Sequence, residues 1–240
     1  MNVRPWKILC DFDGTVSTLD ATDELLDRCA EPEWKDFERQ WRDGVIGSRE
    51  CMTRQVALID ASERDLNRVL DSITIDPAFA QFVADTRAQG VELVIVSDGL
   101  DRAIHRILDN HGLGELRVVS NRLQQVGARR WKMQSPHADA ACRAQSGTCK
   151  CACAGMQATA DSPNILLIGD GQSDICVASR ADFVFAKCPL LDHCRDVGIA
   201  HRPIAGFADA IALLPDLLAG RFDAIPFPIL PLPSQRAEYA

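Results

Sequence analysis

Lys7-Ile8-Leu9-Cys10-Asp11-Phe12-Asp13-Gly14-Thr15 is the stretch that decides the fold. Its apolar run has the length of a β-strand and ends in two aspartates, one residue apart, before a Gly-Thr turn. Carboxylates at the carboxyl end of a strand can share a hard cation and still face a substrate. Aspartate is also common in surface turns, so the alternative is that Asp11 and Asp13 only begin such a turn. Later segments of the chain argue against that alternative.

Three further apolar runs are predicted strands. Residues 91–96 lead into Ser97-Asp98-Gly99, residues 164–168 lead into a Gly-Asp-Gly-Gln-Ser-Asp segment, and residues 182–186 form a short strand. Helical patterns separate these runs, which predicts an α/β fold with a parallel sheet. Right-handed crossovers bring the carboxyl ends of such strands to one edge, where a ligand site is expected. The polar side chains gathered there would be Asp11, Asp13, Ser97, Asp170 and Asp174.

A helical insertion is expected after the first strand. Residues from about 20 to 69 have a helical pattern without a strand signal, and Ser62-Glu63-Arg64-Asp65 is typical of a capping box that opens a helix. We predict that residues 18–75 form this insertion, and that residues 1–17 and 76–224 form the core.

The rest of the core is read in the same way. Asp76-Pro77 predicts the start of a helix that stops near Gly90. Residues 116–131 are expected to form short strands or a hairpin, and residues 207–218 a final helix. The proline-rich tail, residues 225–240, is expected to be extended.

Composition limits the partners. The 240 residues carry a formal net charge of −8, with 47% hydrophobic and 25% charged residues. A concentrated positive face, which polyanion binding needs, is not expected, so we predict no nucleic-acid partner. No apolar run approaches the roughly 20 residues that cross a bilayer, and the first strand follows the amino terminus too closely for a secretory signal. We therefore predict a cytoplasmic protein without a membrane partner.

The predicted cluster of carboxylates is suited to binding a metal ion and to attack on phosphorus. Several carboxylates repel one another unless a cation neutralises them, and ligands that are all oxygen favour a hard ion such as Mg²⁺. One aspartate can attack phosphorus, while a second protonates the leaving oxygen and later activates water.

These motifs resemble the haloacid dehalogenase superfamily of phosphatases. The match covers DFDGT at residues 11–15, the serine at the end of a strand, Ser97, and GDGQSD at residues 169–174. The resemblance implies a Rossmann-like parallel sheet with a small helical cap. It also implies that Asp11 is the nucleophile, and that Asp13 is the general acid/base and a Mg²⁺ ligand through its backbone carbonyl.

The resemblance implies roles for other residues as well. Ser97 and the backbone of Asp98-Gly99 would bind the phosphoryl group. Asp170 would ligate Mg²⁺ together with Asp11. Asp174 would either ligate the ion or support the site without touching the ion directly. The family also has a lysine that stabilises the phosphoryl charge. We favour Lys150 over Lys132 for this role, and the alternative for either is a solvated surface lysine.

The helical insertion resembles the cap of the phosphoserine phosphatase branch, which would close over the site and exclude water. By this resemblance Asp20 and Arg54 would contact the substrate, arginine being suited to a carboxylate or phosphate. The alternatives are a helix N-cap for Asp20 and a surface ion pair for Arg54.

Four of the ten cysteines, Cys142, Cys149, Cys151 and Cys153, are bunched within a segment of weak periodicity, residues 137–160. Four thiolates could hold a structural Zn²⁺. The last three alternate with other residues, so they would converge only on an extended chain. The alternative is a reduced loop without metal.

The Cys-rich segment and the carboxyl-terminal third also resemble two groups of phosphatases. One acts on the keto or enol phosphate of methionine salvage, and the other on phosphoethanolamine or phosphocholine. We predict a Mg²⁺-dependent phosphomonoester hydrolase that forms an aspartyl-phosphate, with the methionine-salvage phosphate as substrate. The alternatives are phosphoserine, a phosphorylated amino alcohol, or a catalytically idle binding protein on the same scaffold. The sequence does not define the oligomeric state, for which a homodimer is one option.

Overall fold

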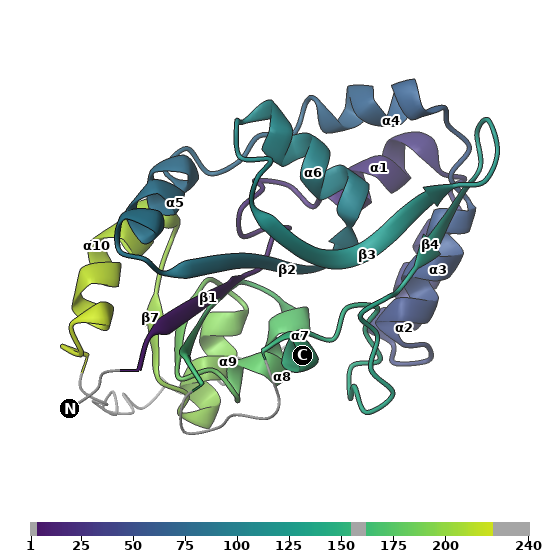
Figure 1. Cartoon of the computed structure of the whole chain (residues 1–240). Coiled ribbons are helices and arrows are strands. Elements are labelled where there is room, and N and C mark those ends of the chain that lie inside the picture. Colours follow the sequence, from purple (N-terminus) through teal and green to yellow (C-terminus); the bar gives the residue numbers. More distant parts are fainter. Residues whose placement is uncertain (1–3, 155–161, 223–240) are drawn as a thin grey trace, which may run out of the picture.

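The computed structural model describes residues 4–154 and 162–222. Within them, seven strands form one sheet in the order β4-β3-β2-β1-β5-β6-β7 (Figure 1). The strands are β1 (Trp6–Cys10), β2 (Glu92–Leu100), β3 (Arg117–Gln125), β4 (Trp131–Gln134), β5 (Asn164–Gly169), β6 (Phe183–Ala186) and β7 (His201–Pro203). All neighbouring pairs are parallel except β3 and β4. The predicted α/β fold with a mostly parallel sheet is therefore confirmed.

Strand β1 lies at the centre of the sheet and sets the register of its neighbours. Cys10 at its carboxyl end is level with Ile95 in β2 and Ile168 in β5. The amide of Asp11 still donates to the carbonyl of Ile168, over 2.9 Å. The residues that follow β1 and β5 consequently meet the carboxyl-terminal part of β2 at one edge of the sheet, as the sequence predicted, although β2 itself continues through Ser97-Asp98-Gly99 to Leu100.

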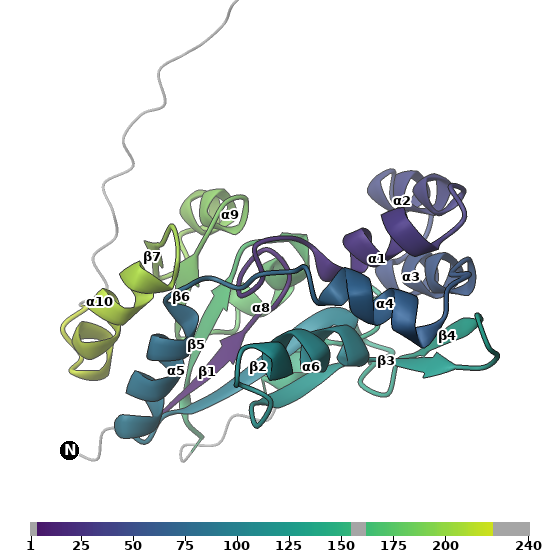
Figure 2. The same cartoon turned by 90° about the horizontal axis from the view of Figure 1, so that it is seen from above.

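The two faces of the sheet have separate cores, because side chains alternate along each strand. Ile8 and Cys10 pack with α5 (Phe79–Ala88), α6 (Asp101–Asn110) and α10 (Phe207–Leu218). Leu9, between them, packs on the opposite face with α7 (Lys150–Cys153), α8 (Ile175–Ala178) and α9 (Leu190–Val197). Figure 2 shows α5 and α6 on one side of the sheet and α8 and α9 on the other.

Helices α1 (Ala21–Cys29), α2 (Trp34–Arg42), α3 (Ser48–Ala57) and α4 (Glu63–Leu70) form the predicted helical cap at one end of the sheet (Figure 2). The capping box at the start of α4 is present: Ser62 accepts from the amide of Asp65, whose carboxylate accepts from the amide of Ser62. The cap contacts the β3–β4 hairpin: the indole N–H of Trp131 on β4 donates to the carbonyl of Ala61, between α3 and α4, over 2.8 Å.

Several details differ from expectation. The hairpin predicted for residues 116–131 is present, but β4 continues to Gln134, while α9 and β7 were not predicted as elements. Helix α5 begins at Phe79, three residues after Asp76, and the Asp76 carboxylate accepts from the amide of Ala78, which precedes the helix, instead of from an amide of its first turn. The division into core and cap by residue number stays a prediction. The predicted tail, residues 225–240, and residues 155–160 of the Cys-rich segment lie outside the described residues.

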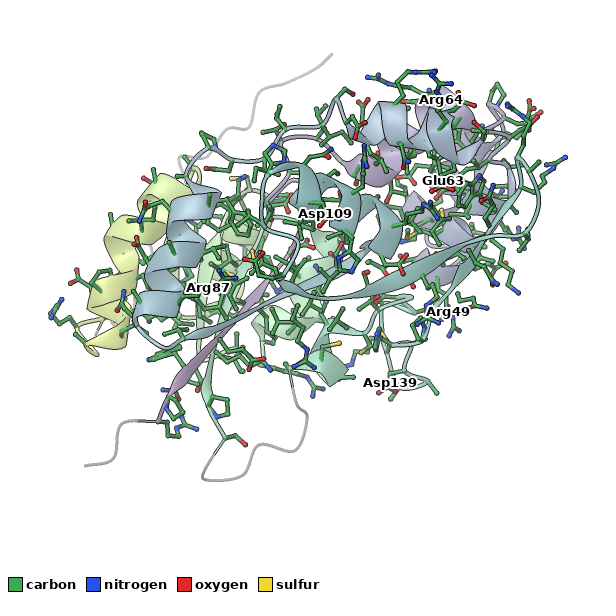
Figure 3. The ribbon with its side chains drawn as sticks, turned by 45° about the horizontal axis from the view of Figure 1, so that its top comes forward. Arg49, Glu63, Arg64, Arg87, Asp109 and Asp139 are labelled. Atoms are coloured by element: carbon green, nitrogen blue, oxygen red, sulfur yellow. The ribbon has the colours of Figure 1, made fainter. Side chains whose placement is uncertain are left out.

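The outer surface carries many charged side chains, for example Arg64 and Arg87 (Figure 3). Most ion pairs there are exposed and contribute little to stability. None of the helices in the described parts of the chain is long and apolar enough to cross a membrane.

Candidate active site

Three carboxylates meet where β1 and β5 end. Asp11 follows β1 directly, and Asp170 and Asp174 follow β5. One oxygen of each lies within 4.8 Å of the others. This spacing, with ligands that are all oxygen, fits a hard divalent cation such as Mg²⁺. Asp13 contributes no carboxylate to this trio, so a metal could reach it only through its backbone carbonyl, as the family resemblance implies.

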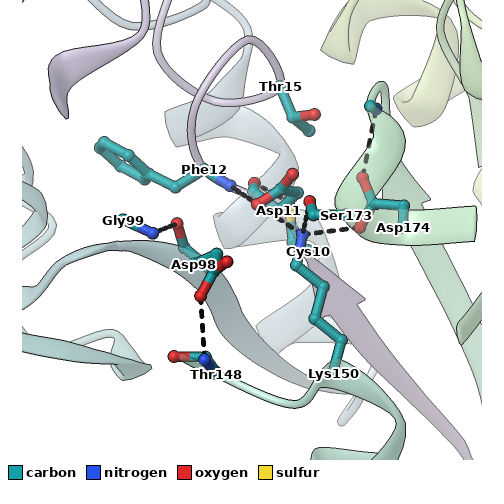
Figure 4. A network of polar contacts seen from close by, with 12 residues as sticks. Cys10, Asp11, Phe12, Thr15, Asp98, Gly99, Thr148, Lys150, Ser173 and Asp174 are labelled. Atoms are coloured by element: carbon teal, nitrogen blue, oxygen red, sulfur yellow. Dashed lines mark hydrogen bonds and ion pairs between the residues drawn. The ribbon is translucent and has the colours of Figure 1, made fainter. Parts of the chain in front are cut away.

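Lys150 lies between two of these carboxylates. Its ammonium nitrogen is 2.8 Å from Oδ1 of Asp11, 2.7 Å from Oδ1 of Asp174 and 3.0 Å from the hydroxyl of Ser173 (Figure 4). The side chain is only 3% exposed. Burial opposes its charge, but the two carboxylates outweigh burial and raise the pKa of Lys150, so it stays protonated. Lys132, the other candidate, is exposed on β4.

The Asp11 carboxylate is buried and is fixed by a hydrogen bond in addition to its contact with Lys150. Its Oδ1 accepts from the amide of Phe12 over 2.8 Å, and the residue is 6% exposed. Burial raises the pKa of Asp11 well above its usual range, the charge on Asp174 adds to this, and Lys150 opposes it. The charged form of Asp11 therefore depends on nearby cations.

Asp13 has a different environment. Its Oδ1 accepts from the amide of Ala21, the first residue of the cap helix α1, over 2.8 Å. Burial raises the pKa of Asp13 well above its usual range, and the charge on Asp20 raises it further. The raised pKa makes the protonated form of Asp13 more accessible than that of an ordinary aspartate, as a general acid needs.

The end of β2 forms the opposite wall. The hydroxyl of buried Ser97 accepts from the amide of Gly99 over 2.9 Å. A Cβ at Gly99 would lie 2.5 Å from Oδ2 of Asp13, so glycine is required for this close approach.

Thr15 and Lys187 lie next to the carboxylates that could hold a metal ion. The Thr15 hydroxyl donates to Oδ1 of Asp170 over 2.7 Å, and burial raises the pKa of Asp170. Lys187, which follows β6, donates to the carbonyl of Gly14 over 2.8 Å. Our interpretation of the sequence gave Lys187 and Ser173 no role, because nothing in their local patterns indicates that Lys187 reaches Gly14 or that Ser173 reaches Lys150.

A cavity of about 230 Å³ separates these groups from the cap. Its floor includes Asp11, Asp13, Ser97, Gly99 and Asp170. Asp20 lines it and also caps α1 by accepting from the amide of Asp23, so both readings of Asp20 fit its position.

Arg54 requires a correction. Its side chain pairs with Glu50 one helical turn away over 2.5 Å, lies over the ring of Phe37, and is 46% exposed. It is not among the described residues that line the cavity. This position does not support the predicted substrate contact and fits the alternative of a surface ion pair.

The cap side of the cavity is acidic and apolar. Asp23 and Glu38 line it beside Trp41 and Met52, and no lysine, arginine or histidine is among the described lining residues. Burial, with the charges of Asp20 and Glu38, raises the pKa of Asp23 to about 7. Among the residues that the structure describes, none of those lining the cavity carries a positive charge that would balance an anionic leaving group.

The proposed zinc site is not supported. Within the described residues, the carboxylate trio is the one group of three or more suitable ligands, although all four cysteines are described. The chain from Lys150 is helical, so Cys149 and Cys151 point in different directions instead of converging as on an extended chain. Cys149 interacts with Cys142, while Cys151 forms a thiol hydrogen bond with Cys176.

Comparison with known proteins agrees with this geometry. The family model for haloacid dehalogenase-like hydrolases matches residues 8–179. A 2-hydroxy-3-keto-5-methylthiopentenyl-1-phosphate phosphatase of an Exiguobacterium species is 30% identical over 210 residues, covering 86% of this chain and 96% of the relative. The enzyme of that name from Geobacillus kaustophilus is 30% identical over 212 residues, covering 86% and 94%.

Solved structures show the same fold. A phosphoserine phosphatase described as a phospho-aspartyl intermediate analogue has a TM-score of 0.65 at 19% identity, covering 88% of this chain and 99% of that chain. The matched motifs, the carboxylate trio and these relatives agree, and the chain is a phosphatase that belongs to the haloacid dehalogenase-like hydrolases.

Proposed function

We propose that this protein is a Mg²⁺-dependent phosphomonoester hydrolase that works through an aspartyl-phosphate on Asp11. The observation that carries the proposal is the contact of 2.8 Å between Asp11, which lines the cavity together with Asp13, and the buried ammonium group of Lys150. A nucleophile and a carboxyl group with a raised pKa thus face the same cavity, and a fixed cation contacts the nucleophile.

Asp11 would attack phosphorus, and Lys150 would balance the charge of the carboxylate and of the phosphoryl oxygens. The carboxylates of Asp11, Asp170 and Asp174, with the carbonyl of Asp13, would hold Mg²⁺. When bound, this ion would supply positive charge to the phosphoryl oxygens and to the nucleophile.

Asp13 would move the protons. In its protonated form it gives a proton to the oxygen of the leaving alcohol as the phosphorus–oxygen bond breaks. The carboxylate that remains then takes a proton from the water that attacks the aspartyl-phosphate, which restores Asp11 and releases phosphate. The hydroxyl of Ser97 and the amides beside Gly99 would bind the phosphoryl oxygens during both steps.

The cap side of the cavity bears on the substrate. The carboxylate of phosphoserine would have no cationic partner there, because Arg54 lies outside the cavity and the described lining has no basic side chain. An uncharged leaving group with a thioether can pack on Trp41 and Met52 and bond to Gln55. We therefore propose the keto or enol phosphate of methionine salvage, which the names of the relatives also indicate.

A phosphorylated amino alcohol is the second candidate. Asp20, Asp23 and Glu38 all line the cavity, and an ammonium group would offset their mutual repulsion. The idle binding protein has less support, because the nucleophile, lysine and acid positions are all filled, Asp11 contacts Lys150, and Asp13 lines the same cavity as Asp11. The cytoplasmic location stays a prediction.

The test is phosphate release by the wild type and by Asp11→Asn with Mg²⁺, on three substrates: the methionine-salvage phosphate, phosphoethanolamine and phosphoserine. Asparagine keeps the shape but removes the nucleophilic charge, so release should fall by at least about a thousandfold. Asp196→Asn, an exposed change on α9, is the matched control. Equal activity of the wild type and Asp11→Asn would disprove the mechanism. Preference for phosphoserine would disprove the argument from the cavity lining.

A further inference from the structure

The side chain of Asp98 contacts three parts of the chain at once. Its Oδ2 accepts from the Ser48 hydroxyl over 2.5 Å, and its Oδ1 accepts from the amide of Thr148 over 2.9 Å and from the Asn121 side chain over 3.0 Å. Figure 4 shows the contact with Thr148. Asp98 itself stands between Ser97 and Gly99, which line the phosphoryl end of the cavity.

Ser48 belongs to the cap, because it is the first residue of α3. The same end of α3 touches the segment before Lys150 a second time, where the amide of Arg49 donates to the carbonyl of Gln145 over 3.0 Å. A Cβ on Gly47 would lie 2.6 Å from the Gln145 side chain, so the two segments are in close contact.

Thr148 lies two residues before Lys150, and the segment between Gln145 and Lys150 has little freedom. Gln145 has a φ of 49°, which is unusual for a residue with a side chain. A Cβ at Gly147 would overlap the Asn121 side chain, and the amide of Cys149 donates to the carbonyl of His137 over 3.0 Å. A force on Thr148 is therefore transmitted to the backbone that carries Lys150.

We propose that Asp98 is a positioning residue that couples closure of the cap to the placement of Lys150. With the cap closed, one carboxylate oxygen holds Ser48 and the other holds the backbone before Lys150. Because Ser48 belongs to the cap, movement of the cap away from the cavity would break this contact. The contact draws Lys150 to its position beside Asp11 at the moment when the substrate is enclosed. The catalytic consequence rests on the function proposed above, whereas the physical link does not.

The first test is hydrogen exchange by mass spectrometry, without substrate. Ser48→Ala removes the cap side of the contact but leaves Asp98 and its other partners unchanged. The proposal expects faster exchange both in the first turn of α3 and in residues 145–150. Thr53→Ala is the matched control, because its hydroxyl is on the same helix but donates to the carbonyl of Arg49 within that helix. Faster exchange in α3 alone would overturn the coupling.

The second test is steady-state kinetics with the best substrate of the panel. Loss of a hydrogen bond to a charged group should lower kcat/KM of Ser48→Ala roughly tenfold, and part of the loss should be in kcat because Lys150 is displaced. Ser48→Thr keeps the hydroxyl and should restore the rate. Asp98→Asn keeps an acceptor for Thr148 and should retain more activity than Asp98→Ala. A rise in KM with unchanged kcat would show that the contact only holds the cap, and would overturn the proposal.

Failure of the coupling proposal can be distinguished from failure of the proposed function. If the wild type releases no phosphate from any substrate, the hydrolase proposal is wrong, while the exchange experiment still decides whether Asp98 links the cap to residues 145–150.

Discussion

At the scale of single residues, the site depends on a few side chains whose charges balance one another inside the protein. Lys150 is the cation between Asp11 and Asp174, and all three are buried. Breaking a buried ion pair leaves an uncompensated charge, which costs more than the loss of an exposed pair.

Lys150→Met should therefore impair both catalysis and folding. Methionine fills a similar volume without charge, so phosphate release should fall at least about a hundredfold. The free energy of unfolding without Mg²⁺ should fall by about 3–5 kcal/mol. Enzyme assays and urea unfolding check this, with Lys132→Met as the control because Lys132 is exposed. Similar losses in both variants would contradict the assignment of Lys150.

Gly99→Ala tests the fit between the end of β2 and Asp13. The added methyl group would lie 2.5 Å from Oδ2 of Asp13, so that carboxyl group must move. We expect kcat to fall roughly tenfold to a hundredfold, because the general acid is displaced. Gly127→Ala is the control, since its nearest contact is an ordinary 3.4 Å to Arg130. Unchanged kcat in Gly99→Ala would show that Asp13 is not fixed by this contact.

At the scale of secondary-structure elements, the cap helices bring acidic groups over the cavity. Asp23 on α1 faces Asp20, Glu38 and Asp27, with Arg42 as the opposing charge. Its pKa is about 7 in the folded protein, compared with 3.8 in a model compound. The folded state therefore holds more protons than the unfolded state between these values, and stability falls as the pH rises through this window.

Asp23→Asn should remove that pH dependence. In the folded state both proteins carry a neutral side chain near pH 4, so their free energies of unfolding should differ least there. Above pH 7 the variant should be more stable by about 1–2 kcal/mol, a value reduced to allow for the partial exposure of Asp23. Urea unfolding from pH 4 to pH 8 without Mg²⁺ measures this. Asp196→Asn is the exposed control, because Asp196 is not among the charges that raise the pKa of Asp23, and a gain that is the same at every pH would contradict the prediction.

At the scale of the whole molecule, the carboxylate trio joins segments far apart in the sequence, since Asp11 follows β1 and Asp170 follows β5. A cation bound there binds the folded chain and not the unfolded one, so it should raise the melting temperature.

At one hundred times its Kd, Mg²⁺ should raise the melting temperature of the wild type by about 5–10 °C. Asp170→Asn should lose most of this shift, while Asp196→Asn should keep it. Burial raises the pKa of Asp170, so its proton must leave before the metal binds, and the shift should shrink as the pH falls. Thermal unfolding with and without EDTA measures the effect. An equal shift in Asp170→Asn would place the metal elsewhere.

Local pattern and motif were enough to predict the sheet, the helical cap and the positions of Asp11, Asp13, Ser97, Asp170 and Asp174. Each of these residues lies within a strand or no more than five residues after one, and the apolar run of each strand can be read from the local sequence. Parallel pairing then brings strand ends together, whatever the loops do. The capping box of α4 was predictable for the same reason, because its partners are three residues apart.

Tertiary structure alone decided how the loops and helix faces meet. The choice between Lys150 and Lys132 depended on the path of the segment after β4, and the exclusion of Arg54 depended on which way α3 is turned. The cysteines of the Cys-rich segment do not converge, because Lys150–Cys153 is helical. Asp98 contacts Ser48 and Thr148, which lie 50 residues before and after it in the sequence. Such contacts come from packing between segments that are distant in the sequence. The periodicity of one segment does not predict how it packs against another.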